Sequence, residues 1–243
     1  GGVAALLVLG AALGVSLPPR DRLLFVAGIG VVGTAGYLLL YTALQIGPVS
    51  VASPVAATNG AIAALLGVFF LQEPLGQWGL AGLVLVSAGV VSASAEPNAI
   101  QRSLRGERPV LPGAALALLA ALLIGVTLFL FDAVVGSVSL VALLLVVRAV
   151  GVVAAVPIFG ALESPPRRPA LVAAGVGILD AGGFVAFILG LRVGRVAVVS
   201  PVSSLFAVVT VVLAWLLLKE PLSTVQKVGL ALVFAGVPLL SGI

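Results

Sequence analysis

The chain consists of long apolar runs, each close to the roughly 20 residues that a helix needs to cross a bilayer. Short segments containing proline, glycine or charged residues separate these runs, for example Gly47-Pro48 and Glu73-Pro74. Polar and apolar residues do not alternate within the runs, as they do in transmembrane β-strands. The pattern predicts an all-α membrane protein with nine transmembrane helices, near residues 2–17, 23–45, 49–71, 77–95, 112–131, 138–160, 170–191, 196–218 and 224–242.

The second half of the chain repeats the first. A shift of about 147 positions makes roughly 30 of about 95 aligned residues identical, more than shared hydrophobicity alone explains. Ser53-Pro54-Val55 then falls on Ser200-Pro201-Val202, and Glu73-Pro74-Leu75 falls on Glu220-Pro221-Leu222. Such internal duplication is typical of secondary transporters, whose substrate sites form between two repeats.

The two copies are predicted to run in opposite directions through the membrane. Helix 23–45 aligns with helix 170–191, and the five crossings that separate their equivalent ends reverse the direction of the second copy. The prediction is therefore an inverted repeat of five-helix units. Its parts are a first repeat at residues 1–95, a linker at 96–111 and a second repeat at 112–243.

The composition excludes several classes of protein. Hydrophobic residues make up 62% of the chain and charged residues only 8%, whereas soluble domains average about 25% charged residues. The chain contains neither cysteine nor histidine, so disulfides, thiolate ligands and the commonest metal ligand are excluded, and no metal or cofactor is predicted. The net charge of +4 comes from few residues, mainly in loops, so no nucleic-acid partner is expected.

The repeated motifs resemble those of EamA-type transporters in the drug/metabolite transporter superfamily. In each copy a Ser-Pro step opens a helix that ends in Glu-Pro-Leu, and a glycine-bearing helix follows. The resemblance implies ten helices in two inverted five-helix repeats, so the chain is expected to lack the first helix and part of the second. It also implies a central cavity, lined in part by helices 23–45, 49–71, 112–131, 170–191 and 196–218.

Two charged residues are predicted to lie deep in the membrane. Asp180 is at the middle of helix 170–191, and Arg148 is about halfway along helix 138–160. A charge at the bilayer centre costs roughly 3 kcal/mol on insertion scales, and intramembrane acids commonly mark transport pathways. Asp180 is therefore a candidate proton-coupling or substrate-amine site, or else it only ties helices together. Arg148 either pairs with Asp180, holds a substrate carboxylate or snorkels to the interface.

Neutral polar side chains form a second set of candidate substrate-binding residues. Two tyrosines recur at helical spacing on one predicted helix, where they line either the cavity or a packing seam. Three smaller residues lie at neighbouring depths on the two aligned Ser-Pro helices, available to a polar solute or to a neighbouring helix. The set consists of Tyr37, Tyr41, Asn59, Ser203 and Ser204.

Two prolines are predicted to break equivalent helices. Pro54 and Pro201 each remove one backbone hydrogen bond and free a carbonyl one turn earlier, so the helices are expected to open near Ser50 and Ala197. Paired interruptions at equivalent positions in two repeats point to a binding site, and they can equally act as hinges or plain kinks.

Small and acidic residues near helix contacts and ends are given structural roles. Glu73 and Glu220 each precede a proline at the end of a helix and are predicted to mark helix boundaries in the interface. Glycines within the helices are predicted to let neighbouring helices approach closely. These glycines are Gly28, Gly30, Gly33, Gly36, Gly82, Gly89, Gly182 and Gly183.

Together these features predict a multi-pass transporter in the inner membrane of a bacterium. An enzyme is not expected, because no second deep acid accompanies Asp180. The leading hypothesis is export of an amino acid or related amphipathic solute, driven by protons or by the solute gradient, as one repeat rocks against the other. A flippase for a lipid-linked substrate and a non-transporting membrane subunit remain alternatives. The sequence identifies neither the solute nor the oligomeric state.

Overall fold

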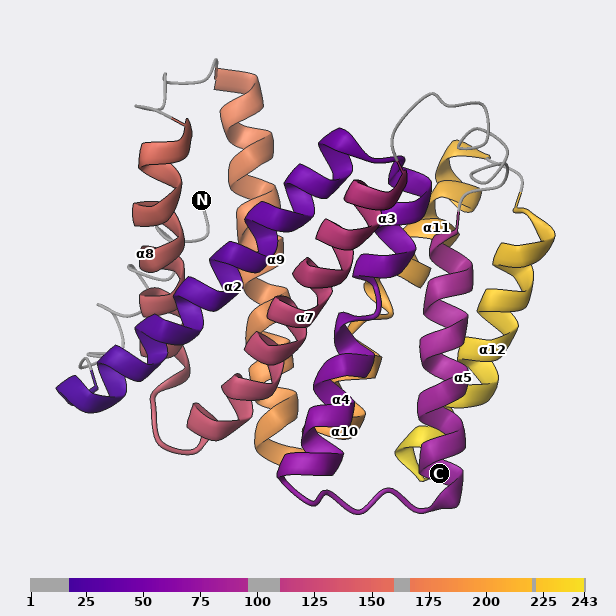
Figure 1. Ribbon diagram of the computed structural model, residues 1–243, viewed down its shortest axis with the longest axis horizontal. Helices are drawn as coiled ribbons and strands as arrows, with labels where there is room; N and C mark the ends of the chain where they lie inside the picture. Colours follow the sequence, from indigo (N-terminus) through magenta and orange to yellow (C-terminus); the bar gives the residue numbers. More distant parts are fainter. Residues whose placement is uncertain (1–17, 96–109, 160–166, 220–221, 243) are drawn as a thin grey trace. The chain divides into compact units, whose positions relative to one another are not determined.

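The computed structural model describes residues 18–95, 110–159, 167–219 and 222–242, and over these residues it contains ten helices and no strand (Figure 1). The all-helical prediction is therefore confirmed for the described part of the chain. The predicted helix at 2–17, most of the linker and Glu220 lie outside the described residues. The helices are α2 Arg20–Ile46, α3 Val49–Ala56, α4 Asn59–Phe70, α5 Gln77–Ser94, α7 Val110–Val135, α8 Leu140–Phe159, α9 Arg167–Val193, α10 Val196–Ser203, α11 Phe206–Leu218 and α12 Thr224–Ser241.

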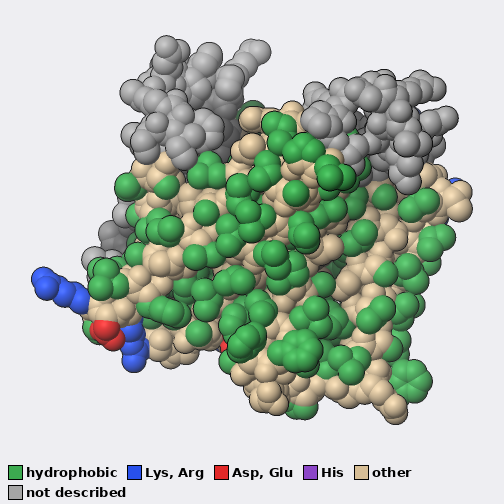
Figure 2. Space-filling model, viewed as in Figure 1, with side chains coloured by type: hydrophobic (Ala, Val, Ile, Leu, Met, Phe, Trp, Pro, Cys, Tyr) green, Lys and Arg blue, Asp and Glu red, His purple; other side chains and the backbone are tan. Residues whose placement is uncertain are grey.

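Seven of the described helical segments are long and apolar enough to cross a membrane. The consecutive helices α3 and α4 form one such segment, and α10 and α11 form another. Hydrophobic side chains are spread over the face shown in Figure 2, and charged side chains there are few. In lipid every backbone polar group must be paired within the protein, and an apolar run that folds as a helix pairs its own groups. The number of nine crossings stays a prediction.

The described helices form two compact units, each assembled from separate parts of the chain. Unit 1 contains the described residues of Gly1–Thr34 together with Leu130–Val193. Unit 2 contains Ala35–Phe129 and the described residues of Gly194–Ile243. Helices α2 and α7 contribute to both units. The predicted division into two repeats and a linker concerns duplication of sequence rather than compactness, and it stays a prediction.

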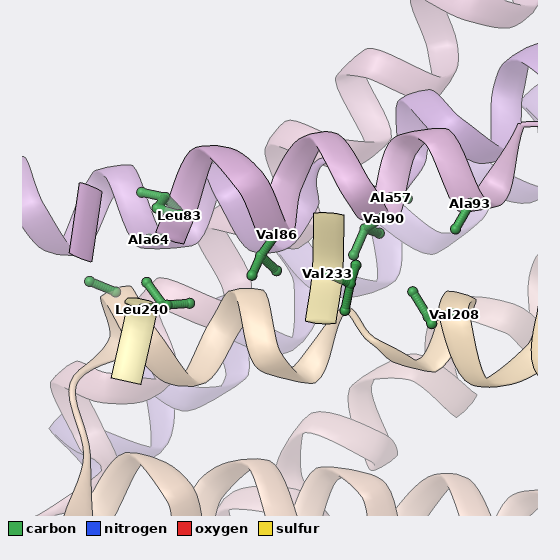
Figure 3. Close-up of a cluster of buried hydrophobic side chains, with 10 residues drawn as sticks. Ala57, Ala64, Leu83, Val86, Val90, Ala93, Val208, Val233 and Leu240 are labelled. Carbon is green, nitrogen blue, oxygen red and sulfur yellow. The ribbon is translucent and has the colours of Figure 1, made fainter. Parts of the chain in front are cut away.

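In unit 2, α5 and α12 lie side by side and antiparallel, with four glycines at their contact (Figure 1). A Cβ atom added to Gly82 would lie 2.8 Å from the carbonyl oxygen of Gly236, and one added to Gly89 would lie 2.8 Å from that of Gly229. The predicted packing role of Gly82 and Gly89 is thus confirmed. Figure 3 shows the side chains that fill the seam, from α5 and α12 respectively: Leu83, Val86 and Val90, and Val233 and Leu240.

In unit 1, aromatic packing joins the end of α7 to α9. Phe131 is fully buried, and its ring centroid lies 6.1 Å from that of Phe184 and 6.4 Å from that of Phe187. Both ring pairs meet edge to face, a favourable geometry for aromatic rings. This cluster fixes the face of α9 that carries Phe184.

The prediction that glycines allow close helix packing is partly wrong for unit 1. Gly30 does pack closely, because a Cβ there would lie 3.1 Å from the Cβ of Val150 on α8. At Gly28, Gly182 and Gly183, however, an added Cβ would meet no described atom within 4 Å. A glycine in an apolar helix can therefore lie at a close helix contact or on an open face. The surrounding sequence does not distinguish the two.

Candidate functional site

Arg148 of α8 and Asp180 of α9 form an ion pair within unit 1. The guanidinium carbon of Arg148 also lies 5.0 Å from the centroid of the Phe184 ring, in cation–π contact. The side chains are partly exposed, at 29% for Arg148 and 44% for Asp180. The structure thus brings together the two charged residues that the sequence predicts at mid-membrane depth, and it adds an aromatic ring that orients one of them.

Phe184 is a member of this site that the sequence reading missed. It follows Asp180 by four positions on α9, and residues four apart lie on the same face of a helix. An aromatic residue one turn from an intramembrane acid was therefore an available signal. Because Phe184 also packs against the buried Phe131, the ring that contacts Arg148 is held in place by the core of unit 1.

The two Ser-Pro helices are each broken about one turn after the proline. Helix α3 ends at Ala56 and α4 begins at Asn59, while α10 ends at Ser203 and α11 begins at Phe206. Under the shift of about 147 positions these two breaks are equivalent. The duplicated sequence therefore produces the same interruption twice.

The predicted opening near Ser50 and Ala197 is wrong, because both residues lie within the first turn of an intact helix. Pro54 and Pro201 are each the sixth residue of an eight-residue helix, and each removes one backbone bond without unwinding the first turn. At the breaks the chain tightens instead. The Thr58 amide donates to the Val55 carbonyl at 3.2 Å, and the Leu205 amide donates to the Val202 carbonyl at 3.1 Å, both across three residues.

The small polar candidates serve these breaks. The Asn59 side-chain amide donates to the Ala56 carbonyl at 2.9 Å. The hydroxyls of Ser203 and Ser204 both donate to the Ser200 carbonyl, at 2.7 and 3.3 Å. These are local side-chain hydrogen bonds to carbonyls in the last turns of α3 and α10, and the Ser200 carbonyl also accepts from the Ser204 amide at 3.2 Å. A direct role for them as solute ligands stays a proposal.

The two breaks lie against each other in unit 2. A Cβ added to Gly60 would overlap the Ser204 hydroxyl and lie 2.7 Å from the Ser200 carbonyl oxygen. A Cβ added to Gly125 of α7 would lie 2.8 Å from the Asn59 carbonyl oxygen. Glycine at both positions is therefore what allows α4, α7 and α10 to meet where the helices are interrupted.

Replacing Gly60 with alanine is expected to separate α4 from α10 and lower the free energy of unfolding by about 2 kcal/mol, as overpacking does in well-packed cores. The measurement is the melting temperature of the purified protein in detergent. Gly28→Ala is the control, because an added Cβ there meets no described atom within 4 Å. Alanine is the better helix former, so a melting temperature that rises in both variants would contradict the close contact at Gly60.

The two tyrosines are exposed on α2. Tyr37 is 38% exposed and Tyr41 is 57% exposed, and both belong to unit 2. The Arg148–Asp180 pair belongs to unit 1. A substrate-binding role for the two tyrosines is therefore a separate proposal. Across the described ranges, no three His, Cys, Asp or Glu side chains gather as a metal site would require.

The Glu73 side chain makes specific contacts in addition to the helix-boundary role that the sequence predicts. One of its carboxylate oxygens accepts from the Val196 amide at 3.0 Å, and the other accepts from the Ala197 amide at 2.8 Å. Its carboxylate therefore caps the N-terminus of α10, a helix 123 positions away in sequence. Beside it, the Arg195 side chain donates to the Pro74 carbonyl at 2.7 Å. Both partners of each contact lie in unit 2.

Apolar helices of membrane-spanning length, a charged pair at mid-helix and paired helix interruptions together define a multi-pass membrane protein. The EamA-like transporter family matches the sequence over residues 1–95 and 111–242. The chain belongs to this family of membrane transporters, and the resemblance predicted from the repeated motifs is confirmed.

One solved structure, titled only "Crystal structure of protein", is similar to this chain. It aligns with a TM-score of 0.77 and 20% sequence identity over 99% of this chain and 84% of that chain. At this identity the likeness shows the fold alone. None of the curated proteins matches the chain.

Proposed function

We propose that the protein exports an amino acid or a related amphipathic solute across the inner membrane of a bacterium, exchanging it for protons. The Arg148–Asp180 pair is the observation that carries this proposal. A pair of opposite charges in an apolar helix bundle is costly to keep, and intramembrane charges usually serve transport. Membership of a transporter family supplies the class of activity.

The charge balance of the pair favours a zwitterionic solute. An amino acid carries one ammonium and one carboxylate on neighbouring atoms, so it can insert between Asp180 and Arg148 and pair with both. Each protein charge then keeps a partner, whereas a singly charged solute would leave one of them uncompensated at a large desolvation cost. The planar guanidinium, oriented by Phe184, suits a carboxylate with two parallel hydrogen bonds.

Proton coupling would use the same carboxylate. A proton on Asp180 and the ammonium of the solute compete for one group, since a neutral carboxyl no longer pairs with a cation. Binding of a proton from one side and of solute from the other therefore exchanges the two without an extra site. This competition makes Asp180 the proposed coupling residue and Arg148 the proposed carboxylate ligand.

Alternating access would come from two inverted repeats rocking against each other. The α5–α12 contact supports this arrangement, because the shift of about 147 positions maps Gly82 onto Gly229 and Gly89 onto Gly236. The pair Gly82–Gly236 then becomes Gly229–Gly89, so the contact maps onto itself. An antiparallel contact with this property is what a two-fold axis between inverted repeats produces.

In proteoliposomes with a trapped pH-sensitive dye, we expect proton flux when a free amino acid is added, at least about tenfold faster than with its N-acetyl or methyl-ester derivative. Each derivative lacks one of the two charges that the pair recognises. The initial rate is measured with a panel of amino acids and their derivatives, at equal concentration. Equal rates for free and blocked compounds would contradict recognition of a zwitterion.

A further inference from the structure

Glu73 forms a clamp between α4 and α10, and we infer that this clamp is a gate. In the structure it fastens α10 to the turn that follows α4, and α10 must be released for this end of unit 2 to open. The inference rests on the transporter class and not on the identity of the solute. It assigns Glu73 a gating role beyond the helix-boundary role that its sequence position predicts.

The clamp is a charged cap on a helix N-terminus. Both carboxylate oxygens of Glu73 are used, one by each of the first two amides of α10. Val196 and Ala197 are fully buried, so water does not compete for their backbone amides. A carboxylate at this position is favoured by the helix dipole and by charge-assisted hydrogen bonds, which are stronger than bonds between neutral groups.

The backbone around Glu73 is shaped for this contact. A Cβ added to Gly67 would overlap the Val196 side chain and lie 2.9 Å from the Glu73 carboxylate, so only glycine lets α10 approach. Gln72 has φ of 54°, in the left-handed region, which residues with a side chain rarely occupy unless their surroundings require it. Lys219, the equivalent residue of the second copy, has φ of 57°. This turn is therefore a repeated feature of the fold.

The position of the clamp relative to the breaks explains how it would act as a gate. Helix α4 runs from its break at residues 57–58 toward Glu73, and α10 runs from the clamp back to its own break at 204–205. The two helices thus lie on the same side of the two breaks, packed against each other at Gly60 and Gly67. Glu73 belongs to the first copy and α10 to the second, so rocking of the repeats pulls on this contact.

The absence of cysteine from the chain allows a direct test. Ser200→Cys places a single thiol on α10, where Ser200 is fully buried and its hydroxyl has no hydrogen-bond partner among the described residues. In proteoliposomes, a membrane-impermeant maleimide should label this thiol slowly. Adding Glu73→Gln, which keeps the size but removes the charge, should accelerate labelling at least about tenfold, from one side of the membrane only.

Asp21→Asn is the matched control in the same Ser200→Cys background, because it removes one negative charge from an exposed residue in the first turn of α2. Labelling in this control should stay at the original rate. Glu73→Asp keeps the charge on a shorter side chain and should give an intermediate rate. Unchanged labelling in folded Glu73→Gln, or equal acceleration from both sides or in the control, would overturn the gate. No solute is added, so this result is independent of the amino-acid proposal.

Discussion

Asp180→Asn is expected to lower solute-dependent proton flux by roughly 100-fold, the range seen when one partner of a close charge pair is removed. Asparagine has nearly the same shape as aspartate, but it can neither exchange a proton nor neutralise the Arg148 guanidinium beside it. Both the coupling step and ammonium recognition should therefore fail together. The measurement is the initial rate of the trapped pH-sensitive dye, compared at equal amounts of reconstituted protein.

A double variant separates transport from structure at this site. Arg148→Asp combined with Asp180→Arg restores an ion pair between α8 and α9 with its charges exchanged. If the pair only ties the helices together, this variant should recover both the melting temperature and the flux. If the pair binds solute, stability should recover while flux stays low, because the ammonium and carboxylate now face the wrong partners. Full flux in the single Asp180→Asn variant would falsify the coupling role.

Gly82→Ala is expected to be the most destabilising single-methyl substitution, lowering the free energy of unfolding by about 3 kcal/mol. The added Cβ would lie 2.7 Å from the Leu240 Cα and 2.8 Å from the Gly236 carbonyl oxygen, and it would also overlap the Leu240 amide. All three are backbone atoms, so no side-chain rotation relieves the overlap and α12 must move away from α5. We expect a fall in melting temperature of roughly 10 °C for a chain of this size.

The matched control lies on α9. Gly182→Ala makes the same chemical change in the interior of a helix, but its Cβ meets no described atom within 4 Å. Because alanine is the better helix former by about 1 kcal/mol, this control should melt at the same temperature or slightly higher. Gly229→Ala, at the position equivalent to Gly82, should destabilise like Gly82→Ala. Similar melting of the Gly82 and Gly182 variants would show that α5 and α12 are less closely packed.

Part of the candidate site was accessible from sequence. The depths of Asp180 and Arg148 follow from counting residues along apolar runs, because the helical rise is fixed at about 1.5 Å per residue. Depth alone does not say which faces of α8 and α9 meet, so pairing was one alternative among several. The equivalence of the Pro54 and Pro201 interruptions also followed from the repeat. The place of each break did not, because it depends on packing at Gly60 and Ser204.

The sequence by itself determined the helical membrane class, the duplicated motifs and the approximate ends of most helices. These features are local, because a transmembrane helix pairs its own backbone groups within the segment. Only the tertiary structure decided that Asp180 pairs with Arg148, that Glu73 caps α10 and that Gly82 packs tightly while Gly182 does not. A helix that is apolar on all sides carries no pattern that identifies its neighbour. Its contacts depend instead on the fit of small side chains between helices far apart in sequence.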